Sequence, residues 1–370
     1  MTSLRAETRI VLADPAATIA PLCAHLEEHG AEISRDGART VLRFGGHNAV
    51  FEASGDAITI VAESPDLAGL LEMRKIIAGH VREYAPADAP PAIIWTGDGV
   101  GTATAPDFRL LTVTALQDVT PHMRRIHLAG EDLARFDRQD ALHVRLYLPQ
   151  SSGQDVRWPS LGEDGLPVPV PEENRPVMRK YTIRAIDAAA GTLAIDFVLH
   201  EDAGPGSAFA ARAQVGDRIG MAGPGGRGLQ PAGRYVFLAD ETGLPAVARM
   251  LASLPADAAG TAMIEVQDEG EEQNLAAPAG IALRWLHRGT AEAGTVPLLQ
   301  QAFDALELPA DGPDLYLWGA MEHEAFRHVR AAARQRLRAE RDKHLVVSYW
   351  RRGLDDEQHM AEKRAARAEA

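Results

Sequence analysis

The sequence predicts a multidomain protein: a small α+β domain (residues 1–97), then an antiparallel β-barrel (residues 104–230), then a doubly wound α/β domain with a C-terminal extension (residues 231–370). Three observations predict this class. A chain of 370 residues is longer than one hydrophobic core usually serves. Strand patterns follow one another almost without helices between residues 108 and 224, whereas strand and helix patterns alternate from residue 235.

Charge and cysteine content narrow the function. The formal charge of −14 repels polyphosphates, so nucleic acid is not expected as a partner. No apolar run approaches the ~18–20 residues that span a bilayer, and the N-terminus lacks signal-peptide features, so we expect a cytoplasmic protein without a membrane span. Cys23 alone cannot build a disulfide, an iron–sulfur cluster or a cysteine zinc site, so redox chemistry would need a bound cofactor.

The first 97 residues contain short strand patterns and two helices. Helical spacing predicts a helix over Pro15–His29 and a second one after Pro65. The second helix is expected to turn Leu67, Leu70, Leu71, Ile76 and Ile77 inward. Strands are expected at 8–12, 41–44, 49–53 and 57–61, and a linker at 85–91.

The first predicted helix contains His25-Leu26-Glu27-Glu28-His29, which matches the H-x-x-E-H zinc pattern. Such a site needs a third protein ligand and a pocket, and the sequence offers neither. We therefore interpret the motif as a solvated polar helix face and expect no metal.

The barrel is predicted from six strands, at 108–115, 124–129, 142–148, 180–185, 193–199 and 218–221. The stretch Gln150–Pro176 interrupts them and is longer than most connections, which indicates a mobile loop or a flap near a ligand.

The stretch Arg179-Lys-Tyr-Thr-Ile-Arg184 is the first candidate site. In a strand, Arg179 and Tyr181 share a face and Thr182 points the other way. An aromatic ring beside cations can stack on a planar ring and meet a phosphate, which suits a flavin. An ordinary edge strand with solvated cations fits the same six residues.

A glycine-rich turn follows the next strand. Gly204 and Gly206 permit close backbone approach, and Ser207 is expected to cap a short helix through Ala211, whose N-terminus could hold a pyrophosphate. An ordinary strand-to-helix turn is the alternative. Downstream, Gly223–Gly228 spells G-x-G-x-x-G, but no helix follows, so we interpret it as a linker.

The α/β domain is predicted from strands at 235–239, 262–267, 282–286, 315–319 and 345–350 and helices at 246–254, 296–306 and 322–340. Ligands of this fold bind at the carboxyl ends of the strands. The expected rim is Asp240–Pro245, Gln267–Glu272, Arg288 and Gly319–Glu322.

Taken in order, these motifs resemble the siderophore-interacting proteins, which are FAD-dependent ferric-siderophore reductases with a ferredoxin–NADP reductase-like fold. The resemblance covers residues 105–360, through 179–184, 196–200, 203–205, 213–217, 240–246 and 348–353. The N-terminal domain resembles DUF2218 through Leu22–His25, His29, Ala62–Asp66 and Ile94–Thr96. Three positions depart from the first family: Phe209 replaces the usual Trp, Gly243 the usual Ala and Met321 the usual Gly.

The resemblance implies an enzyme that passes electrons from NAD(P)H through FAD to chelated Fe(III), and it implies no catalytic acid, base or nucleophile. The implied cofactor-binding residues are Arg179, Tyr181, Thr182, His200, Gly204, Pro205, Ser207, Phe209, Ala210, Asp240, Glu241, Thr242 and Pro245. The ferric siderophore is the expected substrate. Its candidate contacts are Trp350, Arg351 and Arg352, although solvated cations at a strand end would look the same.

The electron donor stays open at this point. The acidic run Asp268–Glu272 would disfavour the 2′-phosphate of NADPH, so NADH is expected at least as readily as NADPH. Ferredoxin is a further candidate donor, and the basic helix over 327–343 would suit it, although a solvated helix face is the simpler interpretation. A flavin reductase or electron-transfer flavoprotein with another acceptor, and a siderophore-binding module without activity, are the alternative functions.

Overall fold

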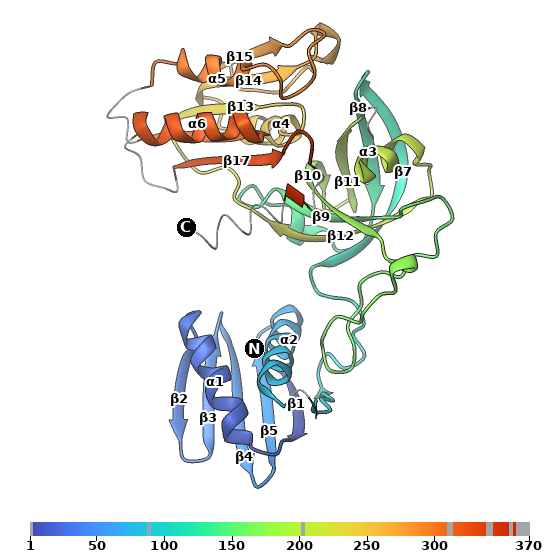
Figure 1. Cartoon of the computed structure of the whole chain (residues 1–370), viewed down its shortest axis with the longest axis vertical. Coiled ribbons are helices and arrows are strands. Elements are labelled where there is room, and N and C mark those ends of the chain that lie inside the picture. Colours follow the sequence, from blue (N-terminus) through green and yellow to red (C-terminus); the bar gives the residue numbers. More distant parts are fainter. Residues whose placement is uncertain are drawn as a thin grey trace. The chain divides into compact units, whose positions relative to one another are not determined.

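The computed structural model describes residues 3–86, 88, 90–200, 204–308, 314–337, 343–354 and 358–359. The chain forms two compact units, residues 1–108 with 157–175, and residues 109–156 with 176–370. The fold class is confirmed: an N-terminal α+β domain, a closed barrel and a parallel sheet are all present (Figure 1). Among the described residues, no helix is long and apolar enough to cross a membrane.

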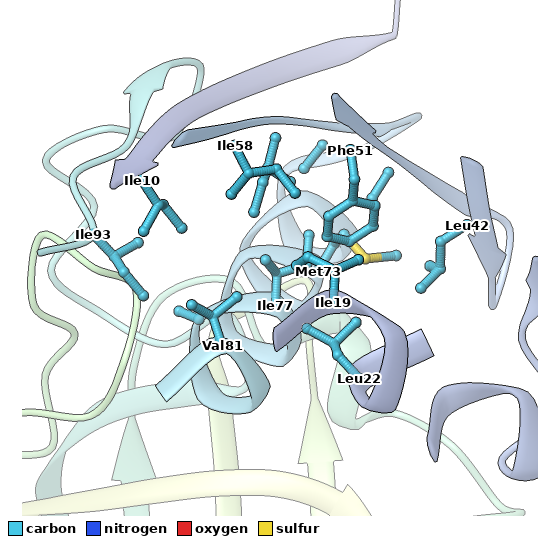
Figure 2. Packing of buried hydrophobic residues seen from close by; sticks show 14 of the residues in the cluster. Ile10, Ile19, Leu22, Leu42, Phe51, Ile58, Met73, Ile77, Val81 and Ile93 are labelled. Atoms are coloured by element: carbon cyan, nitrogen blue, oxygen red, sulfur yellow. The ribbon is translucent and has the colours of Figure 1, made fainter. Parts of the chain in front are cut away.

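The N-terminal unit is an antiparallel sheet in the order β2-β3-β4-β5-β1-β6, with two helices packed on one face. Alternating burial along the strands and Ile19, Leu22, Met73 and Ile77 on the helices make one core (Figure 2). Its elements are β1 (Leu4–Val11), α1 (Pro15–Glu28), β2 (Glu32–Asp36), β3 (Arg39–Phe44), β4 (His47–Ser54), β5 (Ala57–Ser64), α2 (Leu67–Tyr84) and β6 (Thr96–Gly97).

Two expectations for this unit were wrong. Leu67 is 41% exposed, because it is the first residue of α2 and lies beyond the covered turns. Strand β2 was missed, since only Ile33 among its five residues is apolar and its neighbour β3 supplies the pairing.

The H-x-x-E-H helix holds a small group of imidazoles. The ring centroids of His25 and His29 are 4.6 Å apart, and those of His25 and His80 on α2 are 5.1 Å apart. Among the described residues, no group of His, Cys, Asp and Glu is arranged to hold a metal ion.

The long insert between the third and fourth barrel strands belongs to the N-terminal unit. Residues 157–175 pack there, and Leu166 joins the hydrophobic cluster of that unit. This part of the insert packs against α2 and the segment after it, so the expectation of a mobile loop does not hold there. A role as a flap near a ligand stays a prediction.

The barrel is closed in the order β10-β11-β8-β7-β12-β9. All six expected strands are present, and several are longer than the sequence indicated because barrel strands extend past the apolar stretch. Their bounds are β7 (Phe108–Thr120), β8 (Met123–Ala129), β9 (His143–Leu148), β10 (Val177–Asp187), β11 (Thr192–Val198) and β12 (Arg218–Gly225), with helix α3 (Pro205–Arg212) and the 3₁₀ turns η1 (Ala134–Phe136) and η2 (Glu172–Asn174). Gly223–Gly225, expected in a linker, end the last strand.

The C-terminal half is a five-stranded parallel sheet in the order β15-β14-β13-β16-β17. Helix α4 covers one face, and α5 and α6 cover the other. The bounds are β13 (Arg234–Ala239), α4 (Leu244–Ser253), β14 (Ala259–Val266), η3 (Glu269–Glu271), β15 (Gly280–His287), α5 (Leu298–Asp304), β16 (Leu315–Glu322), α6 (His323–Arg336) and β17 (His344–Trp350).

The end of α6 differs from expectation. The described helix stops at Arg336, and residues 338–342 of the expected basic helix lie outside the described residues. Arg336 does not face solvent as a free cation, because its guanidinium donates to the carbonyl oxygens of Phe303 and Leu306. Arg336 therefore holds the end of α6 against the end of α5.

Candidate functional site

Strand β10 carries the first part of the site. The Tyr181 ring is half-buried and packs on Phe197 of β11, with 4.3 Å between ring centroids. Arg179 is also half-buried, and its Nη1 donates to the Met178 carbonyl at 2.8 Å. Thr182 is 4% exposed and hydrogen bonds to Tyr349 of β17. Thr182 thus meets the α/β half, on the strand face opposite Tyr181.

Helix α3 begins directly beside Tyr181. A Cβ placed on Gly206 would lie 2.0 Å from the Tyr181 hydroxyl, so only glycine permits this approach. The N-cap is Gly204, and among the described residues no side chain caps the helix. Its first N–H groups face the turn, where an anion could accept from them. The expected cap was wrong: Ser207 lies inside the helix, and its hydroxyl accepts from the exposed His200 N–H at 3.2 Å.

The next residues of α3 pack into the core of the barrel. Phe209 is 2% exposed in the barrel core, and Ala210 is fully buried beside it. The Phe209 side chain therefore supports the helix and offers no free face to a ligand. Residues 201–203, which precede Gly204, lie outside the described residues.

The second part of the site lies at the carboxyl edge of the parallel sheet. Strands β13 and β16 are neighbours there, and the chain runs outward from them in both directions, so this is the topological switch point where such folds bind ligands. Asp240 follows β13 and Glu322 ends β16. The predicted rim residues therefore do share one edge.

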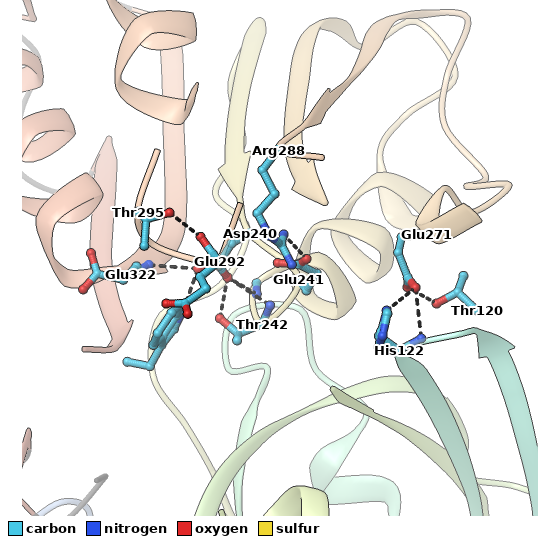
Figure 3. A network of polar contacts seen from close by, with 12 residues as sticks. Thr120, His122, Asp240, Glu241, Thr242, Glu271, Arg288, Glu292, Thr295 and Glu322 are labelled. Atoms are coloured by element: carbon cyan, nitrogen blue, oxygen red, sulfur yellow. Dashed lines mark hydrogen bonds and ion pairs between the residues drawn. The ribbon is translucent and has the colours of Figure 1, made fainter. Parts of the chain in front are cut away.

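Asp240 organises this edge (Figure 3). Its Oδ1 accepts from the Thr242 N–H at 2.9 Å and the Thr242 hydroxyl at 2.5 Å, and its Oδ2 accepts from the Glu322 N–H at 2.9 Å and the Trp350 Nε1–H at 2.8 Å. Burial raises the pKa of Asp240, and these hydrogen bonds oppose the shift. The carboxylate joins three strand ends.

Comparison with known proteins agrees with this geometry. Residues 112–228 match a siderophore-interacting FAD-binding domain, residues 232–353 a siderophore-interacting protein domain, and residues 7–96 DUF2218, an uncharacterised protein conserved in bacteria. The ferric vibriobactin reductase ViuB of Vibrio cholerae is 31% identical over 69% of this chain and 93% of its own. The chain belongs to the siderophore-interacting protein family.

Further proteins resemble the chain in sequence or structure. The NADPH-dependent ferric-chelate reductase of Escherichia coli is 34% identical over 57% of this chain and 80% of its own. The siderophore-interacting protein SipS of Aeromonas hydrophila is 36% identical, with a TM-score of 0.59 over 71% of this chain and 98% of its own. A siderophore utilization protein from T. fusca is 39% identical, with a TM-score of 0.58 over 70% and 98%.

The barrel has features that fit FAD, which joins a flavin ring to adenosine through a pyrophosphate. The site brings an aromatic ring and a cation on β10, Tyr181 and Arg179, next to the N-terminus of α3 at Gly204. The absent side chain at Gly206 keeps the backbone close to the ring. These features suit a planar ring joined to a pyrophosphate.

A third carboxylate, that of Glu265, lies near Asp240 and Glu322 at this edge of the sheet. Glu265 on β14 is 4% exposed and lines a cavity of about 10 Å³, room for roughly one water, together with Asp240, Glu322 and Trp350. Burial, followed by the neighbouring charges of Asp240 and Glu241, raises the pKa of Glu265 to about 8, against the opposing effect of Arg288. Arg288 itself pairs with Glu241.

Glu265 should make stability depend on pH. The folded chain holds this proton up to about pH 8, whereas the ordinary glutamate value is 4.5. The folded state therefore binds more protons in that window, and its free energy of unfolding falls as pH rises, by at most ~1.4 kcal/mol per pH unit from this group. Glu265→Gln should flatten the dependence in urea denaturation between pH 5 and 8. Glu269→Gln, on the exposed η3 turn, should leave this pH dependence unchanged. If the free energy of unfolding changes with pH equally in both variants, the raised pKa of Glu265 is not its source.

Gly243, the N-cap of α4, lies where the backbone of β16 leaves no room for a side chain. A Cβ here would lie 2.5 Å from the Ala320 carbonyl oxygen and 3.0 Å from the Ala239 Cβ. We expect Gly243→Ala to lower the free energy of unfolding by ~1–3 kcal/mol through overpacking. Thermal denaturation checks this, with Gly225→Ala as the control, because a Cβ there meets nothing within 4 Å.

Sequence reasoning missed the ties between barrel and sheet. Glu271 is 3% exposed, and its carboxylate accepts from the Thr120 hydroxyl at 2.5 Å and the His122 N–H at 3.0 Å, with His122 Nδ1 at 2.7 Å (Figure 3). Glu271 is therefore not among the acids of the Asp268–Glu272 run that could face a cofactor. Nothing in the run distinguishes the buried glutamate from its exposed neighbours.

Arg249 is the second tie. It is 5% exposed on α4, and its guanidinium donates to the carbonyl oxygens of Ile183 at 3.1 Å and Arg138 at 2.9 Å. An arginine in the middle of an otherwise apolar helix was the signal that could have found it, since such a cation needs buried acceptors.

The expected substrate contacts are partly engaged already. The Trp350 indole is committed to Asp240, and Arg352 Nη2 pairs with Glu292 at 2.6 Å, with both side chains more than half exposed. Arg351 follows Trp350 at the end of β17. These residues lie together at the acidic edge, and their contact with a siderophore remains a prediction.

Proposed function

We propose that this protein is a cytoplasmic FAD-dependent ferric-siderophore reductase, with FAD in the barrel (residues 104–230) and the nicotinamide donor at the carboxyl edge of the sheet (residues 231–370). The observation that carries the proposal is the Tyr181 ring beside the N-terminus of α3, where Gly204 is the N-cap. The 31% identity to a ferric vibriobactin reductase supports the choice of acceptor.

The reaction balances as one NAD(P)H and two ferric siderophores giving NAD(P)⁺, a proton, two ferrous ions and two released siderophores. When bound, FAD supplies the exchange between two-electron and one-electron transfer. The chain's own residues bind and orient: Arg179 for phosphate, Tyr181 for the ring and the α3 N–H groups for pyrophosphate. Trp350, Arg351 and Arg352 are the proposed siderophore contacts.

The nucleotide preference is a separate proposal. With Glu271 engaged in the barrel and Glu272 paired with His287 at 2.8 Å, Asp268 and Glu269 are the exposed acids that would oppose a 2′-phosphate. We expect NADH to serve at least as well as NADPH. Steady-state kcat/KM with each donor measures this, and a hundredfold advantage for NADPH would overturn it.

The deciding experiment mixes the FAD-loaded protein anaerobically with NADH or NADPH and a panel of hydroxamate and catecholate ferric chelates. A ferrous trap reports product while absorbance follows the flavin. We expect donor-dependent ferrous product. Reduction of the flavin without ferrous product from any chelate would indicate a flavin reductase or electron-transfer flavoprotein instead, and a colourless protein that rejects FAD would indicate a binding module. Adding reduced ferredoxin in place of nucleotide tests the other donor.

A further inference from the structure

The segment Arg157–Arg175 leaves the barrel after β9 and returns to it at β10, yet it packs as part of the N-terminal unit (Figure 1, green loop beside α2). Its two arms are joined near the base by the Arg157 N–H, which donates to the Asn174 carbonyl at 2.9 Å. At its tip, the Gly162 N–H donates to the Leu166 carbonyl at 2.8 Å, and Leu161 bridges to Pro167. The segment is therefore a closed hairpin rather than an open loop.

Asp164 at this tip binds the N-terminal unit. Its Oδ2 lies 2.6 Å from Arg82 Nη2 on α2, and its carbonyl accepts from the Trp95 Nε1–H at 3.0 Å. Trp95 is 2% exposed, so this acceptor satisfies an indole N–H that water cannot reach.

Asp164 also supplies charge to a buried cation. Arg74 on α2 is 3% exposed, stacks over Trp95 at 5.5 Å and donates to the Gly99 carbonyl at 2.7 Å. Burial lowers the pKa of the Arg74 guanidinium, and the Asp164 carboxylate opposes that shift. A buried cation without its counter-charge is strongly unfavourable. The N-terminal unit thus depends on a residue from the barrel's insert.

An apolar contact also holds the hairpin tip on the N-terminal unit. Leu166 packs against the core of the N-terminal unit, and Gly79 on α2 leaves room for its side chain, since a Cβ there would lie 3.9 Å from Leu166 Cδ2. Gly165 has φ +82° and comes close to the Arg74 side chain. The tip therefore fits a surface on α2 made of Arg74, Gly79 and Arg82.

We propose that the N-terminal unit acts as a clamp on the β9–β10 connection: it binds the Asp164–Leu166 tip and so restricts the conformations of the chain that leads into strand β10. Val177, the first residue of β10, is two residues after Arg175, and Arg179 and Tyr181 follow. An unclamped connection of this length would sample many conformations and loosen the strand start. The part of this proposal that concerns FAD rests on the proposed function.

The test uses the full-length protein loaded with FAD, and compares Asp164→Asn with Glu163→Gln. Both variants remove one negative charge at adjacent positions, but Glu163 is exposed. Hydrogen exchange followed by mass spectrometry should show opening of 157–175 and of α2 increased about tenfold or more in Asp164→Asn and unchanged in Glu163→Gln. FAD dissociation should be several-fold faster in Asp164→Asn alone.

Leu166→Ala provides a second variant that acts through packing, and it should raise exchange in the same two segments. Unchanged exchange in both Asp164→Asn and Leu166→Ala would overturn the clamp. Raised exchange with unchanged FAD dissociation would overturn its coupling to β10. If the protein does not bind FAD, the proposed function is wrong, but hydrogen exchange in residues 157–175 and α2 would still test the clamp.

Discussion

Tyr181→Ala is expected to weaken FAD binding ten- to hundredfold. This range corresponds to the ~1.5–3 kcal/mol that burying one large apolar side chain contributes. The ring packs on Phe197, and its hydroxyl lies against Gly206. Alanine would therefore remove the surface on which the flavin stacks, and it would also leave an empty space between β10 and α3. Bound flavin after gel filtration and a titration of apoprotein with FAD measure the loss.

Two further variants sharpen that result. Tyr181→Phe keeps the ring and should retain most of the affinity, whereas Arg179→Ala should lose a smaller share through the phosphate. If Tyr181→Ala and Arg179→Ala both retain stoichiometric FAD, β10 is not the flavin strand.

Asp240→Ala is expected to lower the free energy of unfolding by ~3–5 kcal/mol. The change leaves the Trp350 indole N–H, the Glu322 N–H and the Thr242 N–H without their acceptor at a buried edge. Urea denaturation followed by tryptophan fluorescence gives the value, and the Trp350 environment should change as well.

Asp187→Ala is the matched control, because its carboxylate also accepts from a backbone N–H, that of Ala190 at 2.9 Å, but in an exposed turn. It should cost only ~0.5–1 kcal/mol. Equal losses for the two variants would mean that Asp240 does not join the strand ends as described.

The sequence predicted the fold from local patterns. Strand spacing indicated the barrel, the alternation after residue 235 indicated the parallel sheet, and the order of motifs identified the family. These predictions succeeded because period and turn chemistry are properties of neighbouring residues. The rim residues Asp240, Arg288 and Glu322 were found for the same reason, since each follows or ends a strand.

Other features depend on residues far apart in the chain. Ser207 looks like a helix cap, but the helix already begins at Pro205 after the N-cap Gly204, and its first turn lies against Tyr181 from a distant strand. Glu271 looks like one acid in a solvated run, yet Thr120 and His122 bury it.

The amino-acid sequence by itself determined the class of each domain, the family and the strand that we propose holds FAD, because local patterns and short motifs encode these. Only the tertiary structure decided which charges are buried and which face a ligand. It also assigned residues 157–175 to the N-terminal unit, through an ion pair between Arg82 and Asp164. Burial and ion pairing arise between distant segments, and no local pattern carries that information.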